Sequence, residues 1–127
     1  MKKEVVEVDQ KGFSLLEVLI GLIILSIGLL AIAGMQVTAV RGNFFSSNLT
    51  QASILAQDRM EILRNLDISH ADLSVGTHHE GTIGTTIFTR EYTVSLVPGT
   101  TMLDITVTVR WRDESDHSIS FSTVRAQ

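Results

Sequence analysis

The stretch of sequence that decides the fold is residues 12–40, which read GFSLLEVLIGLIILSIGLLAIAGMQVTAV. Within it, residues 18–40 are 23 consecutive positions with no Asp, Glu, Lys or Arg. A helix rises about 1.5 Å per residue, so this segment spans roughly 35 Å and is long enough to cross the hydrocarbon core of a bilayer. The sequence therefore predicts one membrane-spanning helix near the N-terminus.

Charged residues on the two sides of the apolar stretch indicate its orientation. Three lysines precede it, at positions 2, 3 and 11, and only Arg41 follows it closely. The positive-inside tendency then places the N-terminus in the cytoplasm and the residues after the span on the other side of the membrane. A cleaved secretory signal is the alternative, with the small residues Ala31 to Ala33 as its cleavage site. A retained span fits better, because apolar residues continue as far as Val40.

Glu17 is the one carboxylate at the edge of this apolar segment. A carboxylate within hydrocarbon costs on the order of 3 kcal/mol and is usually kept for a partner. One interpretation is an interfacial residue whose side chain reaches back to water. In the other, a cut between Gly12 and Phe13 creates an α-ammonium at the helix N-terminus, four residues before Glu17. That cut would supply the missing positive charge.

The stretch KGFSLLEVLIGLIILSIGLL, residues 11–30, resembles the N-terminal processing and assembly motif of type IV prepilins. The resemblance implies that a membrane prepilin peptidase cuts after Gly12 on the cytoplasmic side and methylates the amine of Phe13. It also implies that Glu17, the fifth residue of the mature chain, serves subunit assembly by pairing with the amine of a neighbouring subunit. The leader, residues 1–12, departs from the short and strongly basic form because it holds three acids.

Residues 41–67 change from uniformly apolar to periodic. Apolar residues recur at every third or fourth position, which is typical of the amphipathic half of a helix lying on a small domain. The stripe consists of Phe45, Leu49, Ala52, Ala56, Met60 and Leu63. No proline interrupts residues 13–67, so one continuous helix is predicted, with residues 13–40 in the membrane or filament core.

The remaining residues, 68–127, are predicted to form a periplasmic antiparallel sheet. Alternating apolar residues predict one strand over residues 88–96 and a second over residues 103–111, joined by a hairpin turn. Ile119 and Phe121 indicate a third, shorter strand. The expected fold class is α+β, a long transmembrane and amphipathic helix packed on a small antiparallel sheet.

Polar segments of the C-terminal part predict loops and turns. Residues 70–84, HADLSVGTHHEGTIG, are glycine-rich and predict a loop between helix and sheet. His70, His78 and His79 in this loop, with Glu80, are potential metal ligands. Their spacing is not helical, so it does not direct these side chains toward one point. Adjacent histidines on extended backbone point in opposite directions, and no metal site is expected. The acidic turn at residues 113–116 lacks the glycine and distal glutamate of an EF-hand loop.

Composition excludes several classes of function. The chain has 10 Lys and Arg against 14 Asp and Glu, a net charge of −4, which does not favour nucleic-acid binding by the chain itself. It has no cysteine, which excludes disulfides and thiolate chemistry. No nucleophile motif or phosphate-binding glycine loop is present, so neither an enzyme nor a cofactor is expected.

Three further segments resemble those of the PilV-type minor pilins: SIGLLAIAGMQ, QASILAQDRMEILRNL and VTVRWRDESDHSISFSTVRAQ. The resemblance implies a minor pilin that is held in the inner membrane, processed, and incorporated into a type IV pilus or its initiation or tip complex. The implied partners are prepilin peptidase, other major and minor pilins in a hetero-oligomeric filament, and the inner-membrane assembly platform. Two alternatives remain, a minor pseudopilin of the I class from type II secretion and a membrane-anchored periplasmic binding module that never polymerises.

Overall fold

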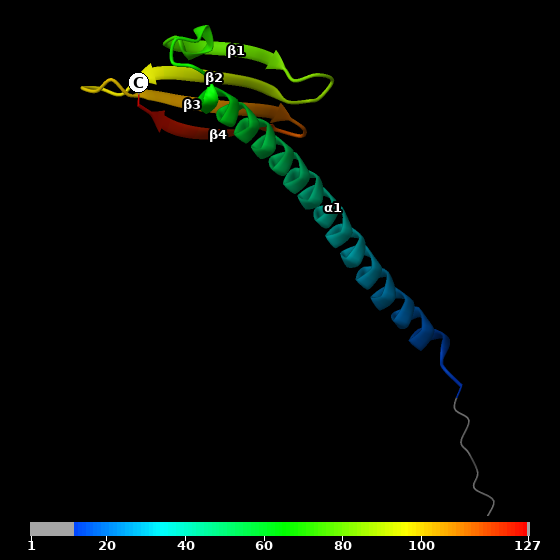
Figure 1. Ribbon diagram of the computed structural model, residues 1–127. Coiled ribbons are helices and arrows are strands. Elements are labelled where there is room, and N and C mark those ends of the chain that lie inside the picture. Colours follow the sequence, from blue (N-terminus) through cyan, green and yellow to red (C-terminus); the bar gives the residue numbers. More distant parts are fainter. Residues whose placement is uncertain (1–11, 127) are drawn as a thin grey trace, which may run out of the picture. The chain divides into compact units, whose positions relative to one another are not determined.

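The computed structural model describes residues 12–126, which form one long α-helix, a short 3-10 helix and four strands (Figure 1). The leader predicted at residues 1–12 lies outside the described residues except for Gly12, and so do its three lysines. The elements are α1 (Leu15–Asn65), η1 (Ala71–Leu73), β1 (Gly76–Thr82), β2 (Thr89–Leu96), β3 (Leu103–Arg112) and β4 (Asp116–Arg125). The chain divides into two compact units between Gly42 and Asn43, and each unit is described by itself.

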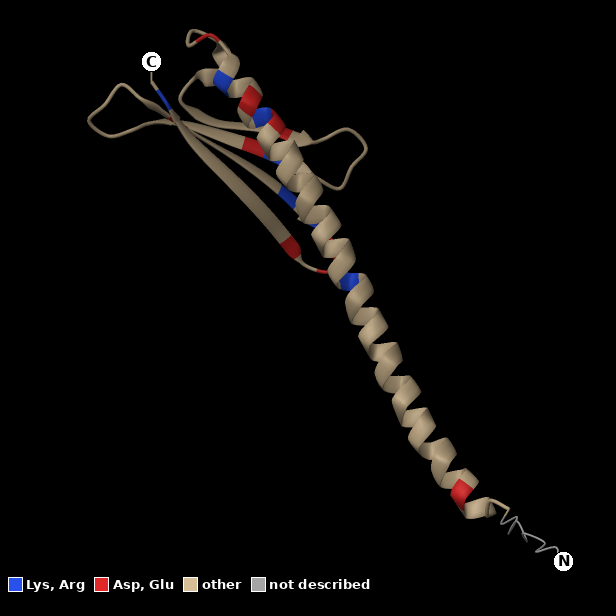
Figure 2. Ribbon diagram, turned by 60° about the horizontal axis from the view of Figure 1, so that its bottom comes forward, with Lys and Arg blue, Asp and Glu red and all other residues tan. Residues whose placement is uncertain are grey.

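The first unit holds the apolar half of α1. Every side chain between Leu15 and Gly42 is exposed, and even Ile20, the least exposed large apolar residue there, keeps 49% of its surface accessible. Figure 2 shows that this part of the helix carries no charge between Glu17 and Arg41. By length and composition α1 is able to cross a membrane, as predicted.

The second unit contains a four-stranded antiparallel sheet in the order β1-β2-β3-β4. β3 alternates strictly, because its apolar residues from Leu103 to Trp111 are buried while the residues between them face outward. This period of two is the pattern expected of a strand with one covered face. The structure therefore confirms the predicted α+β class.

The core of this unit forms where the second half of α1 meets one face of the sheet. The predicted stripe is buried from Ala52 to Leu63, and Leu49 is partly buried against the same cluster. Phe45 remains 41% exposed, but its ring centroid lies 6.5 Å from that of Trp111. The two alanines have no exposed surface, and their small side chains permit a close approach of helix and sheet.

Two predictions about the strands were wrong. The expected loop at residues 70–84 contains β1, which lacks apolar alternation because it is an edge strand with mostly exposed side chains. Backbone pairing to β2 and the stacking of His78 on Tyr92 hold it in place. β4 is not short, because it pairs with β3 over ten residues. Serines at the alternate positions 118, 120 and 122 sustain a strand whose outer face meets solvent.

Candidate processing and assembly site

The N-terminal end of α1 presents the predicted processing site to solvent. Gly12 and Phe13 precede the helix and are exposed, with 82% of the Phe13 surface accessible. Apart from its chain neighbours, no atom of the described residues lies within 4 Å of the position that a Cβ on Gly12 would occupy. No described residue therefore covers the bond between Gly12 and Phe13.

Ser14 starts the helix, and sequence reasoning missed it. Its Oγ accepts a hydrogen bond from the Glu17 backbone N–H at 3.2 Å, and its carbonyl accepts one from Val18 at 3.2 Å. This is the N-cap arrangement, which satisfies one of the N–H groups that a helix leaves without an intrahelical partner. The pattern Ser-x-x-Glu at residues 14–17 is the sequence signal that would have found it.

Glu17 lies in the first turn of α1 and is the only acidic residue there. Its negative charge interacts favourably with the positive end of the helix dipole. Among residues 12–126, no side chain forms an ion pair with its carboxylate, while the helix beyond it is uncharged as far as Arg41. Both the dipole and an external cation are thus available explanations for a carboxylate at this position.

The polar residues of the apolar half are adapted to an environment without water. Ser26 Oγ donates to the Leu22 carbonyl at 2.7 Å, and Thr38 Oγ1 donates to the Gly34 carbonyl at 3.2 Å. Such internal bonds matter in lipid, where an unsatisfied hydroxyl costs several kcal/mol. Gly21 and Gly28 have open space around them, which allows a second helix to approach closely.

The three histidines of residues 70–84, two of which lie in β1, are placed apart, and each has its own partner. His70 Nδ1 accepts the Asp72 backbone N–H at 3.2 Å and caps η1. His78 stacks on Tyr92 with 4.6 Å between ring centroids, whereas His79 Nδ1 lies 3.1 Å from Glu91 on the other face. Within residues 12–126, no three His, Cys, Asp or Glu side chains are grouped to hold a metal ion.

The acidic turn between β3 and β4 is organised internally. Asp113 Oδ1 accepts the backbone N–H groups of Ser115 at 3.2 Å and Glu114 at 2.6 Å, and it lies 3.0 Å from His117 Nε2. These hydrogen bonds lower the pKa of the Asp113 carboxyl below its usual value, and the bond from the Ser115 backbone N–H contributes most. The turn uses its carboxylate to close the hairpin.

An ion-pair cluster that the sequence did not reveal joins α1 to β1 and β2. Arg59 Nε lies 2.7 Å from Glu80 Oε1, the guanidinium of Arg90 pairs with the other oxygen of Glu80, and all three side chains are at most 22% exposed. Arg90 Nη1 also donates to the Leu55 carbonyl at 3.0 Å. Residues this distant in sequence meet only after the strands have paired, so no local sequence pattern predicts the cluster.

Comparison with known proteins bears on the N-terminal end of α1. A family model described as the prokaryotic N-terminal methylation motif matches residues 9–33, which include Gly12, Phe13 and Glu17. Searches of curated proteins and of solved structures gave no match. The motif belongs to structural proteins of the pilin type, and it implies processing by a prepilin peptidase. Together with the apolar half of α1, it supports a membrane-anchored protein of the type IV pilin-like or pseudopilin kind.

Proposed function

We propose that this chain is a minor pilin of a type IV pilus. It inserts in the inner membrane with its N-terminus in the cytoplasm, and a prepilin peptidase cuts it between Gly12 and Phe13 and methylates the new amine. The mature chain then enters the filament or its initiation or tip complex. The observation that carries this proposal is the methylation motif on a helix half whose apolar side chains are exposed among the described residues, 12–126.

The geometry around the cut supports the processing step. Helix α1 begins at Leu15, so the bond after Gly12 lies outside the hydrogen-bonded helix, where a peptidase is able to bind it as extended backbone. After the cut, the Phe13 amine stands just before the capped first turn. A positive charge at that place opposes the helix dipole, so a nearby carboxylate becomes favourable.

Glu17 supplies that carboxylate, and its proposed partner is the Phe13 amine of a neighbouring subunit. In a filament core of low dielectric, opposite charges attract strongly, whereas an unpaired carboxylate is strongly destabilising. Pairing is then possible only when two subunits lie at one axial offset. The charge would therefore set the register between helices whose apolar surfaces alone permit sliding.

A minor pseudopilin of a type II secretion system is the second candidate, and the same motif favours it. It would use the same anchoring, cleavage and helix packing within a short periplasmic filament. Mass spectrometry of sheared and purified surface pili separates the two candidates. Peptides of this chain in the pili support the minor pilin. Their absence from the pili but presence in the membrane would exclude it and leave the pseudopilin and the anchored binding module.

The same measurement tests the processing. The expected N-terminal peptide begins at Phe13 and carries one additional methyl group on its amine. A mature chain that begins at Gly34 would instead support a cleaved secretory signal ending at Ala33, and it would overturn the proposal.

The role of Glu17 is tested by Glu17→Val. We expect this variant to insert in the membrane and to be cut after Gly12, but to be lost from the sheared pilus fraction on immunoblots. Ser14→Ala is the matched control, because it removes the hydrogen bond to the Glu17 N–H and keeps the carboxylate. Equal loss of both variants would indicate that helix initiation matters rather than charge. Loss of cleavage in Glu17→Val would place its role in recognition by the peptidase.

A further inference from the structure

The two edges of the sheet differ in how they are protected against further pairing. β1 is seven residues long, and its register shifts between His79 and Gly81, where Gly81 has a φ of 73°. β4 pairs over ten residues with no shift, and it has neither proline nor glycine. Its acidic and basic residues, Asp116 and Arg125, lie at its two ends, so the middle of the strand lacks the charged side chains that protect exposed edges from further pairing.

The free edge of β4 presents backbone groups and small side chains. Ser118, Ser120 and Ser122 occupy successive exposed positions, so no bulky side chain obstructs the approach of another strand. Ile119 and Phe121, which point toward the core, are only partly buried. The core is therefore incompletely covered along this edge, whereas the equivalent residues of β3 are sealed.

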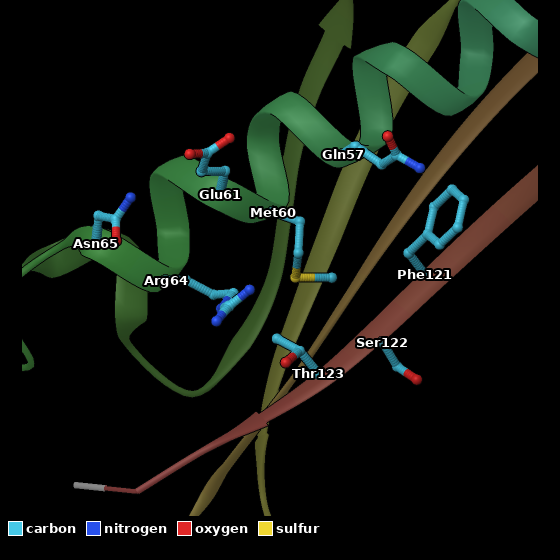
Figure 3. A pocket seen from close by; sticks show the side chains of 8 residues that line it. All are labelled: Gln57, Met60, Glu61, Arg64, Asn65, Phe121, Ser122 and Thr123. Atoms are coloured by element: carbon cyan, nitrogen blue, oxygen red, sulfur yellow. The ribbon is translucent and has the colours of Figure 1, made fainter.

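A groove of about 440 Å³ lies between β4 and α1 (Figure 3). Met60 and Arg64 project into it from the helix, and Phe121 and Thr123 line it from the strand. An edge strand beside a helix is the geometry in which extended peptides add to a sheet. In that mode the main chain gives affinity and alternate side chains enter the groove.

One end of this groove holds an arginine. Arg64 points into the groove (Figure 3), and Glu61 also lines it. Arg64 forms no ion pair within residues 12–126. Arg125 Nη1 donates to the carbonyl of Leu63, the residue that precedes Arg64, at 3.2 Å. Arg125 does not line the groove, so Arg64 is the group that an incoming carboxylate would complement.

We propose that β4 and this groove bind an extended, acidic segment of another subunit. The segment adds to β4 as a further antiparallel strand, places alternate apolar side chains against Met60 and Phe121, and sets a carboxylate beside Arg64. The inference rests on the proposed function, which supplies the neighbouring subunit. It assigns the periplasmic unit a contact of its own, separate from the packing of the apolar helices.

A second copy of this chain does not fit as the occupant. Two β4 strands pair antiparallel in one continuous sheet only about a two-fold axis normal to the sheet. Copies of one chain within a filament of single polarity are not related by such an axis. A different neighbouring subunit with a free strand of its own meets the geometric requirement.

The test uses the full chain in nonionic detergent and a short acetylated peptide amide in which threonine and valine alternate before a terminal aspartate. We expect the peptide to slow hydrogen exchange of amides in β4 and to leave those of β1 unchanged. Arg64→Glu should weaken peptide binding at least about ten-fold, and Arg64→Lys should retain most of it. The same peptide ending in asparagine should bind more weakly to the wild-type chain.

Each remaining outcome overturns the inference. Protection at β1 instead of β4, or no binding at all, would show that the β4 edge does not take the segment. Equal binding to Arg64→Glu would show that the charge of Arg64 does not contribute. Tighter binding of a peptide copied from residues 116–125 would make a second copy the occupant. The peptide assay needs no filament, so the two proposals are tested separately. Failure of peptide binding would not contradict incorporation that depends on Glu17. Loss of incorporation would not contradict peptide binding.

Discussion

The two halves of α1 belong to one continuous helix and are both rich in apolar residues, yet they differ in how those residues are buried. Between Leu15 and Gly42 no side chain is buried, whereas the half from Asn43 onward buries Ala52, Ala56, Met60 and Leu63. The second half finds its apolar partner in the sheet that follows it in the chain. Within residues 12–126 the first half has no such partner, and an apolar surrounding such as lipid would stabilise it.

The difference also appears in the arrangement of apolar residues. A helix that is apolar on all sides has no preferred face, and it is stable only in an apolar surrounding. Complete burial of a Leu, Ile or Val side chain contributes about 1.5–3 kcal/mol. The first half carries more than ten such residues, all exposed, so its transfer from water is strongly favourable. The stripe of the second half contributes less area but fixes one orientation.

Removal of residues 1–42 is the strongest test of the difference between the two halves of α1. We expect the chain of residues 43–127 to leave the membrane fraction completely and to fold in water, since its core lies within these residues. Fractionation and near-ultraviolet circular dichroism of Trp111, the single tryptophan, check the two expectations. Retention in washed membranes, or loss of the tryptophan signal, would show that the two halves are not independent.

A large effect is expected from Trp111→Ala in the full chain. Trp111 is 3% exposed and packs near Phe45 and Phe88, so its removal leaves a cavity and should lower the free energy of unfolding by about 3–5 kcal/mol. Leu25→Ala, in the exposed half, should change it by less than about 0.5 kcal/mol. Native-state hydrogen exchange of β3 amides measures both. Equal effects of the two substitutions would contradict the division of the helix.

The parts of the fold that follow from strong periodicity could be predicted from sequence. The uncharged run predicted the apolar half of α1, the stripe ending at Leu63 predicted its buried face, and the alternation from Leu103 to Trp111 predicted β3. Each pattern repeats over several turns or residue pairs. Burial on one face then leaves one solution.

The parts of the fold that depend on distant partners could not be predicted from the sequence. β1 has no apolar period, and it exists because β2 offers it a backbone ladder. Arg59, Glu80 and Arg90 meet only when helix, β1 and β2 are assembled. At the proposed processing site, Glu17 was recognisable from its apolar surroundings. The Ser14 cap was also encoded locally, in the pattern Ser-x-x-Glu, which charge and hydropathy alone do not reveal.

A smaller effect should follow from Glu80→Gln, which sharpens the contrast between buried and exposed charge. The change leaves two largely buried guanidinium groups without their shared carboxylate, so we expect a loss of about 1–3 kcal/mol. Glu61→Gln, on the exposed side of the same helix, should stay within about 0.5 kcal/mol. Urea denaturation of the chain of residues 43–127 gives both values. A silent Glu80→Gln would mean that the cluster contributes no stability.

The smallest effect concerns Tyr92, the only tyrosine of the chain, which reports the dielectric environment beneath the second half of α1. Burial raises the pKa of its hydroxyl above the usual 10.0, and the Asp72 carboxylate raises it further, while the hydrogen bond and positive charge of Arg59 act in the opposite direction. Because the folded pKa is the higher one, the corresponding stability is fully present below about pH 10 and is lost as the pH rises through the folded pKa.

Ultraviolet absorbance of tyrosinate during an alkaline titration measures this difference. The midpoint in the folded chain should exceed the midpoint in urea, and Asp72→Asn should lower the folded midpoint without abolishing the difference, because burial is the larger cause. Equal midpoints in the folded and unfolded chain would mean that water reaches Tyr92 freely. The second half of α1 would then fail to seal the sheet, and the contrast with the exposed first half would be one of degree.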